Sequence, residues 1–225
     1  MYPFDRQVAA LSQNYRCIIP DRSGYGRSPR PTQFPADFHY RAASETLSFL
    51  DSFGIERAVL WGHSDGAVIA AILGFTAPQR MKALILEAIH YYALKPRSRD
   101  FFETLASQPE SVSADLRNRF AQVLGSDHWR ALITTHSKAW LQLAKNSKGA
   151  GDDLYGGRLG EITAPTLIIH GALDPRTEPD ELDDLRQQLP HAEMHILGGG
   201  SHSPHSENAT AHAVTSLAKE FLAKI

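Results

Sequence analysis

The sequence of 225 residues contains a single cysteine, Cys17, which excludes an internal disulfide. Cys17 lies in a short apolar run, so we expect a small buried hydrophobic residue rather than a reactive thiol. The chain also lacks the roughly 20 consecutive apolar residues that a membrane-spanning helix needs. No apolar signal-peptide segment is visible at the start, so we expect a cytoplasmic protein with no membrane partner.

A large excess of charge of either sign is absent as well. Lys and Arg number 23 against 25 Asp and Glu, and the net charge of -2 gives no reason to expect a nucleic acid partner. The 11 histidines could suggest a metal, but no pair has ligand spacing on a helix and no thiolate or carboxylate cluster accompanies them. We therefore expect neither a metal nor a cofactor.

Hydrophobic residues make up 42% of the chain, which is enough for a core. Short apolar runs alternate with helical segments along most of it. We expect strands at residues 15–20, 58–61, 81–87, 166–171 and 193–197, and helices that include residues 4–14, 40–54 and 209–225. The runs are nearly continuous rather than alternating, which is typical of a parallel sheet covered on both faces. The predicted fold class is α/β, with a mostly parallel sheet.

Strand signals stop between Tyr91 and Gly160, where the sequence is polar and helical in character. We expect a helical insertion at residues 91–160 that acts as a lid, between core segments at 1–90 and 161–225. The alternative interpretation is a plain run of helices that covers the sheet.

The segment Gly62-His63-Ser64-Asp65-Gly66 matches the pattern G-x-S-x-G. An apolar strand precedes it and a small apolar helix follows, which is the setting of a nucleophile elbow. Its two glycines are expected to let backbone approach backbone where a side chain would clash. Ser64 is therefore the candidate nucleophile, and the alternative is an ordinary strand-to-helix turn.

A serine hydroxyl needs a base to take its proton, and the base needs an acid to hold its tautomer. Asp174 and His202 each follow a predicted strand, at the sheet edge where ligands bind in open parallel sheets. We expect them to form a triad with Ser64. The alternatives for the two roles are Asp180, Asp183, Asp184 and His205; His63 is expected to point elsewhere, and His170 to be a structural hydrogen-bonding residue.

Four motifs resemble those of the α/β-hydrolase superfamily, in the same order and over nearly the whole chain. They are D-x-x-G-x-G-x-S at 21–28, the elbow at 62–66, H-G-x-x-D at 170–174, and G-H-S-x-x-x-E at 200–207 with an extra serine before the histidine. Asp65 after the serine, and an insertion ending near Trp140, are similar to the valacyclovir-hydrolase-like esterases. The enol-lactone hydrolases are also similar.

The resemblance implies a serine hydrolase that acts on a small carboxylic ester, with amino-acid esters and lactones among the candidate substrates. It implies that the backbone N–H of Asp65 stabilises the oxyanion and that the Asp65 carboxylate helps to hold a substrate α-amino group. Other residues expected to line the substrate pocket, with ordinary core packing as the alternative for each, are Tyr25, His90, Tyr91, Tyr92 and Trp140.

The sequence departs from this family at its start. Members carry two or three strands before the helix expected at residues 4–14, and the last strand ends in a His-Gly loop that donates one oxyanion-hole N–H. Losing one such donor costs roughly 10²–10³ in rate. We expect Met1 to be an internal methionine of a longer protein. The alternative hypothesis is a truncated or degenerate, catalytically impaired hydrolase that binds partners or forms homo-oligomers through exposed sheet edges.

Overall fold

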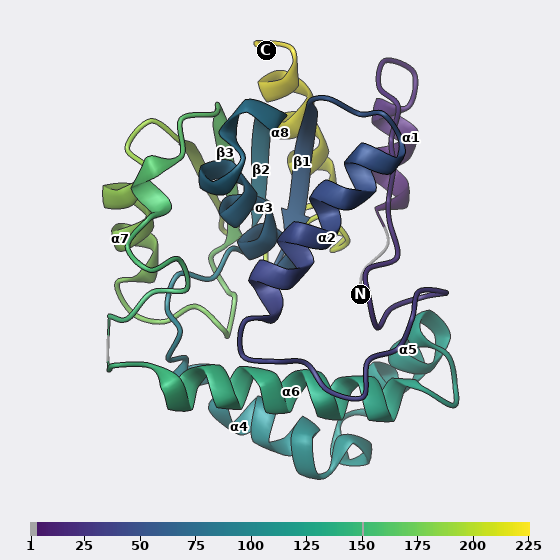
Figure 1. The fold of residues 1–225 in the computed structure, drawn as a ribbon. Coiled ribbons are helices and arrows are strands. Elements are labelled where there is room, and N and C mark those ends of the chain that lie inside the picture. The colour runs from purple at the N-terminus through teal and green to yellow at the C-terminus, as the bar shows by residue number, and fades with distance from the viewer. Residues whose placement is uncertain (1–3, 150) are drawn as a thin grey trace. The chain divides into compact units, whose positions relative to one another are not determined.

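The computed structural model describes residues 4–149 and 151–225, which divide into two compact units (Figure 1). The first, called the core unit here, contains residues 39–92 and 153–225 together with the described residues before 18. The second, called the helical unit, contains residues 18–38 and 93–152.

A four-stranded sheet forms the centre of the core unit. Strands β1 (Ala58–His63), β2 (Met81–Glu87), β3 (Thr166–Gly171) and β4 (Glu193–Leu197) lie in that order, and every neighbouring pair is parallel. The register places His63 beside Glu87 and Glu87 beside Ile169. The carboxyl ends of the strands therefore meet at one edge of the sheet, and the predicted parallel α/β fold is confirmed.

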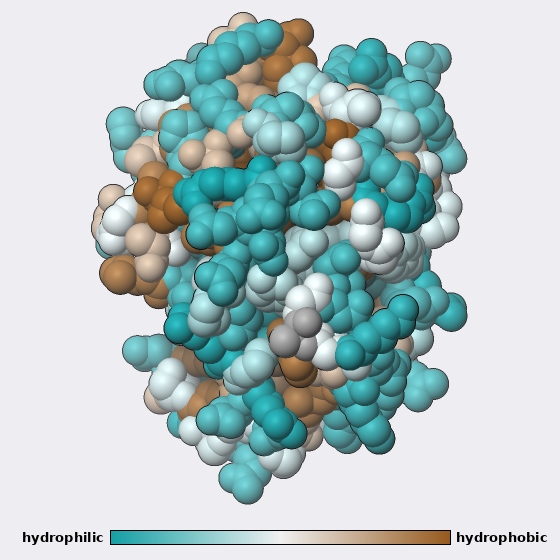
Figure 2. Space-filling model, turned by 90° about the vertical axis from the view of Figure 1, so that its left-hand side faces the viewer, coloured by the Kyte–Doolittle hydropathy of each residue, from teal (hydrophilic) through white to brown (hydrophobic). Residues whose placement is uncertain are grey.

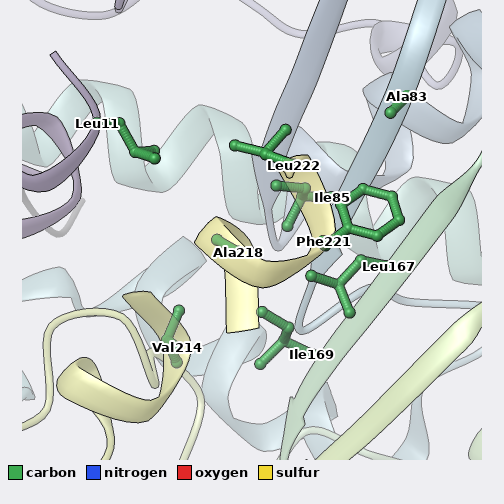
Figure 3. Close-up of a cluster of buried hydrophobic side chains, with 9 residues drawn as sticks. All are labelled: Leu11, Ala83, Ile85, Leu167, Ile169, Val214, Ala218, Phe221 and Leu222. Carbon is green, nitrogen blue, oxygen red and sulfur yellow. The ribbon is translucent and has the colours of Figure 1, made fainter. Parts of the chain in front are cut away.

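Helices cover both faces of this sheet (Figure 1). Helix α3 (Asp65–Thr76) packs on β1 and β2, with Gly74 facing Leu84. Helices α1 (Asp5–Leu11) and α8 (Ala211–Leu222) cover the other face, where Ile85 points into their apolar cluster (Figure 3). Adjacent residues of β2 thus face opposite layers, as the pleat requires. Burying each large side chain of such a cluster contributes about 1.5–3 kcal/mol.

The core unit is completed by α7 (Glu181–Gln188), the short helices η1 (Pro78–Arg80) and η3 (Leu159–Glu161), and all but the first residue of α2 (Phe38–Ser52). In Figure 1, α2 lies on the same side of the sheet as α3. The helical predictions for residues 4–14, 40–54 and 209–225 correspond to α1, α2 and α8.

The helical unit consists of α4 (Pro96–Ser107), η2 (Pro109–Ser111), α5 (Ala114–Leu124) and α6 (Trp129–Asn146), together with residues 18–38. Helix α4 packs along α6. The two ends of the segment 93–152 come together, because the N–H of Ala93 donates to the carbonyl of Asp152 at 2.8 Å. The sequence interpretation had placed residues 18–38 with the core, whereas the structure groups them with the helices.

Two expectations for residues 15–20 are wrong. No strand forms there, Cys17 is exposed, and Ile19 is 64% exposed. A parallel strand needs the backbone of a neighbouring strand for its hydrogen bonds, and β1 at the edge of the described sheet pairs only with β2. The short apolar run therefore stays irregular, and Cys17 gains no buried position.

No helix within residues 4–149 and 151–225 has the length and apolar character to cross a membrane. On the face shown in Figure 2, hydrophilic side chains predominate and hydrophobic ones lie between them in several small groups. That face offers no single broad apolar surface.

Candidate active site

Ser64 lies in a tight turn between β1 and α3, with backbone angles φ 55° and ψ -120°. This conformation is uncommon for a residue with a side chain and is typical of functional turns. A Cβ on Gly62 would lie 2.0 Å from the carbonyl oxygen of Gly66, so the close approach requires glycine at 62. A Cβ on Gly66 would meet nothing within 4 Å. The expectation that both glycines are needed for space is therefore wrong for Gly66.

The structure brings together the three side chains that the motifs singled out, all within the core unit. His202 Nε2 lies 3.1 Å from Ser64 Oγ, and His202 Nδ1 lies 2.8 Å from Asp174 Oδ2. The three residues follow β1, β3 and β4, so their loops meet at the carboxyl edge of the sheet. This is the geometry of a nucleophile, a base and an orienting acid.

Burial determines the charges of this group. Burial lowers the pKa of His202 to about 4, the nearby Arg176 acts in the same direction, and Asp174 opposes both. Burial alone would raise the pKa of Asp174, but the hydrogen bond and charge of His202 and the N–H of Arg176 hold it at about 2. At neutral pH the imidazole is therefore a neutral base beside an ionised carboxylate.

Close backbone packing and the Glu207 carboxylate fix the loop that carries His202. A Cβ on Gly171 would lie 2.0 Å from the carbonyl oxygen of Ser201, so the acid loop and the histidine loop touch through backbone. Glu207 accepts hydrogen bonds from the N–H groups of Ser201 at 2.7 Å and Ser203 at 2.9 Å, one on each side of His202. The final Glu of the histidine motif thus holds the loop in place.

A second buried pair lies next to this loop. Glu87, at the end of β2, accepts from the backbone N–H and from Nδ1 of His205, at 2.9 and 2.8 Å, and both side chains are fully buried. Burial opposes the charge of Glu87, but the bonds from His205 lower its pKa below the ordinary value. His205, the rival candidate for the base, is therefore occupied by a different carboxylate.

The other histidines of the motifs have structural contacts. His63 Nε2 donates to the carbonyl of His202 at 2.7 Å, and burial lowers the pKa of His63 to about 3. His170 Nε2 lies 2.6 Å from the hydroxyl of Thr177 and 3.5 Å from Asp174 Oδ2. In the part of the chain that the structure describes, no group of His, Cys, Asp and Glu is arranged to hold a metal ion.

The three alternatives to Asp174 as the acid of the triad lie before or within α7 and have other contacts or positions. Asp180 precedes α7, Asp183 forms an exposed ion pair with Arg186 at 2.6 Å, and Asp184 accepts from the hydroxyl of Tyr92 at 2.5 Å. Asp174 is the acid that contacts His202.

Three of the predicted pocket residues follow β2. His90 is buried, and its Nε2 lies 3.4 Å from Ser64 Oγ. The N–H of Tyr91 donates to the buried Glu181 at 2.7 Å, and burial raises the pKa of the Tyr91 hydroxyl. Burial and the bond to Asp184 raise the pKa of Tyr92. His90 therefore lies beside the elbow, while Tyr91 and Tyr92 are held by carboxylates of α7. The contact of these three residues with a substrate stays a prediction.

Asp65 and His39 form a buried contact. Asp65 is the first residue of α3, and His39 Nε2 donates to its Oδ1 at 3.0 Å. The side chain that the resemblance assigned to a substrate amino group therefore already carries a partner from α2.

Tyr25 and Trp140 lie in the helical unit. Tyr25 belongs to an apolar cluster with Leu105, Trp129 and Leu132. Trp140 is buried and stacks on Phe102 with ring centres 5.4 Å apart. Core packing explains both positions, and their assignment to a pocket wall stays a prediction.

The sequence interpretation missed His39 and the pair of Glu87 with His205. His39 lies 26 residues from its partner, and no local pattern connects the two. Glu87 did offer a signal, because a charged residue ends an otherwise apolar strand. Its partner lies 118 residues away and only the fold brings it close.

The sequence matches the profile of the alpha/beta hydrolase family over residues 1–214. The chain belongs to the alpha/beta hydrolase family. It is 24% identical to the Homo sapiens serine hydrolase BPHL over 222 residues, which are 97% of this chain and 74% of that protein. The predicted superfamily is confirmed, and the similarity to hydrolases supports a hydrolase activity.

Solved structures share the fold. A hydrolase from Pseudomonas aeruginosa superposes with a TM-score of 0.74 at 22% identity, covering 97% of this chain and 84% of that one. The enol-lactonase from Burkholderia xenovorans superposes with a TM-score of 0.65 at 24% identity, covering 96% and 84%. At these identities the likeness extends to the fold alone.

Proposed function

We propose that this chain is a serine hydrolase that cleaves a small carboxylic ester through an acyl-enzyme, without a metal or cofactor. The observation that carries the proposal is the pair of contacts made by the His202 ring. Its Nε2 lies 3.1 Å from Ser64 Oγ, and its Nδ1 lies 2.8 Å from Asp174 Oδ2. A neutral buried imidazole between a hydroxyl and an ionised carboxylate is suited to general-base catalysis.

The proposed reaction has two halves. In acylation, Ser64 Oγ attacks the ester carbonyl while its proton passes to His202, and His202 then protonates the departing alcohol. In deacylation, water attacks the acyl group, gives a proton to His202, and Ser64 recovers its proton as the acyl–oxygen bond breaks. Asp174 keeps the Nδ1 proton in place and stabilises the imidazolium that forms in each half.

The oxyanion needs donors that point to where negative charge develops. We assign one of them to the backbone N–H of Asp65, the residue after the nucleophile, as in a nucleophile elbow. Asp65 begins the 12-residue helix α3, and the positive end of a helix dipole favours an anion at this position.

The substrate class follows from the surroundings of Asp65. An ammonium group on the substrate has to compete with His39, which already donates to the Asp65 carboxylate at 3.0 Å. An uncharged ester or lactone needs no such exchange. We therefore place uncharged small esters and lactones ahead of amino-acid esters.

Hydrolysis of p-nitrophenyl butyrate by the wild type and by Ser64→Ala tests the proposal. We expect Ser64→Ala to lower kcat by at least about 10³, because a triad without its nucleophile retains only a small residual activity. Ser48→Ala is the matched control, since Ser48 is exposed on α2 and its hydroxyl donates to the carbonyl of Ser44, one turn earlier in the same helix, at 3.2 Å. Equal rates for the wild type and Ser64→Ala would reject the function.

A further inference from the structure

Ser64 faces a second imidazole that the triad does not use. His90 Nε2 lies 3.4 Å from Ser64 Oγ, on the loop after β2, and His90 is 4% exposed. Its ring is nearly parallel to that of His202, with ring centres 5.6 Å apart and an angle of 13°. The nucleophilic oxygen therefore lies within reach of two ring nitrogens from two different strand ends.

The backbone around His90 is held on several sides. Ala88 adopts φ 48°, a conformation that is uncommon for a residue with a side chain. Its N–H donates to the carbonyl of Ile169 at 2.9 Å, and the Tyr155 hydroxyl donates to the carbonyl of His90 at 2.5 Å. Glu181 accepts from the N–H of Tyr91 at 2.7 Å. A strained turn retained by several buried bonds is typical of a functional position.

The hydrogen-bonding partners of His202, Ser64 and His90 indicate which atoms carry the protons. Ionised Asp174 keeps a proton on His202 Nδ1, so His202 Nε2 is an acceptor. The single proton of the Ser64 hydroxyl then points to His202. A lone pair of Oγ faces His90 Nε2, and two lone pairs repel each other. Only a His90 ring that carries a proton on Nε2 satisfies this arrangement.

We propose that His90 donates a hydrogen bond from Nε2 to Ser64 Oγ and is a positioning residue for the nucleophile. This inference rests on the proposed serine hydrolase function. The bond fixes the rotamer of Ser64 and leaves the second Oγ lone pair for attack on the carbonyl. In deacylation, the same N–H stabilises the negative charge that develops on Oγ while the acyl–oxygen bond breaks and His202 returns the proton. His90 keeps its proton throughout, so every proton transfer goes through His202.

Kinetics on p-nitrophenyl butyrate test the role. We expect His90→Ala to lower kcat about tenfold, the size of one hydrogen bond, with KM within about twofold of the wild type. His90→Gln, whose side-chain amide offers an N–H at similar reach, restores most of kcat. His191→Gln is the matched control, because His191 is exposed on the loop between α7 and β4. A rise in KM alone, equal for Ala and Gln, would show a pocket wall and overturn the inference.

The protonation state of His90 is also measurable without turnover. In protein labelled with ¹⁵N-histidine, the ring signals missing from the His90→Gln spectrum identify His90, and their pattern gives the tautomer. The inference requires a proton on Nε2; a neutral ring protonated only on Nδ1 would overturn it. If the wild type shows no Ser64-dependent ester hydrolysis, the proposed function fails, and this spectrum still decides the hydrogen bond.

Discussion

At the scale of single residues, the contacts of Ser64 Oγ explain why one serine differs from its neighbours. His202 Nε2 lies 3.1 Å away and is itself held by Asp174 at 2.8 Å. The pKa of about 4 for His202 leaves the imidazole free to accept a proton at neutral pH. The reactivity assigned to Ser64 therefore depends on the proton at His202 Nδ1 and on the carboxylate that keeps it there.

Replacing that carboxylate tests this dependence. Asp174→Asn presents an amide that no longer requires the Nδ1–H tautomer, so we expect kcat to fall by about 10³–10⁴ while KM changes little. The measurement is steady-state hydrolysis of p-nitrophenyl butyrate, with circular dichroism to verify the fold.

Asp183→Asn is the control for charge and size, because Asp183 pairs only with exposed Arg186 among the bonds described for its side chain. We expect it to keep kcat within about twofold. An Asp174→Asn variant with wild-type kcat would remove Asp174 from the site.

The sequence could predict those candidate site residues that lie in a recognisable local motif. Ser64, Asp174 and His202 each stand in a local motif, and the structure places them in contact. His39 is hydrogen-bonded to Asp65, and His205 to Glu87, and the two partners in each pair are distant in sequence. Such partners become visible only when the fold brings them together.

At the scale of elements, the turn from β1 into α3 is the feature on which the site depends. Gly62 approaches the backbone of Gly66, whereas Gly66 has open space around its own Cβ position. Backbone atoms cannot rotate aside, so the two glycines of one motif differ in what they tolerate.

We expect Gly62→Ala to destabilise the protein by about 1–3 kcal/mol, in the range of an overpacked core, and to lower activity by shifting Ser64. Gly66→Ala should be neutral or stabilise α3 by up to about 1 kcal/mol, because alanine favours a helix more than glycine does. Urea unfolding of both variants gives the comparison. Equal stability of the two variants would contradict the close approach at Gly62.

The strands show where sequence patterns succeed and fail. The runs at 81–87, 166–171 and 193–197 became β2, β3 and β4 with the expected bounds. Burial on both faces explains the apolar runs of β2 and β3, whereas β4 at the edge of the described sheet is only partly buried. The run at 15–20 looked similar but pairs with no strand in the described sheet. Strand formation needs a partner, which no local window contains.

At the scale of the whole molecule, buried histidines make stability depend on pH. The pKa of His202 is about 4 and that of His63 about 3, against about 6.5 for an unfolded histidine. The unfolded chain therefore binds more protons between those values, and stability falls as pH drops below about 6.5. Asp174 does not contribute to the change in stability between pH 7 and 5, because it is ionised in both states there: its pKa is about 2 when folded and about 4 when unfolded.

We expect the free energy of unfolding to decrease from pH 7 to pH 5 by about 2 kcal/mol for each such histidine. Urea unfolding at several pH values measures the slope, and His63→Gln should make it shallower by that amount. A slope that the substitution leaves unchanged would show that His63 is not held neutral in the fold.

The division into two units was only partly readable from the sequence. The loss of strand signals after residue 91 pointed to a separate helical segment, and the described residues 93–149 form helices and turns. Residues 18–38 belong to the same unit, and Tyr25 shares an apolar cluster with Leu105 and Trp129 there. A glycine-rich loop gives no sign of which partner it will pack against.

The most direct test of the central claim is the intact mass of the protein after treatment with a fluorophosphonate, which reacts with an activated serine. The account predicts one adduct on the wild type, none on Ser64→Ala, and slower labelling of His202→Ala. A folded wild-type protein that forms no adduct, or an adduct that persists in Ser64→Ala, would contradict the assignment of Ser64 as the nucleophile.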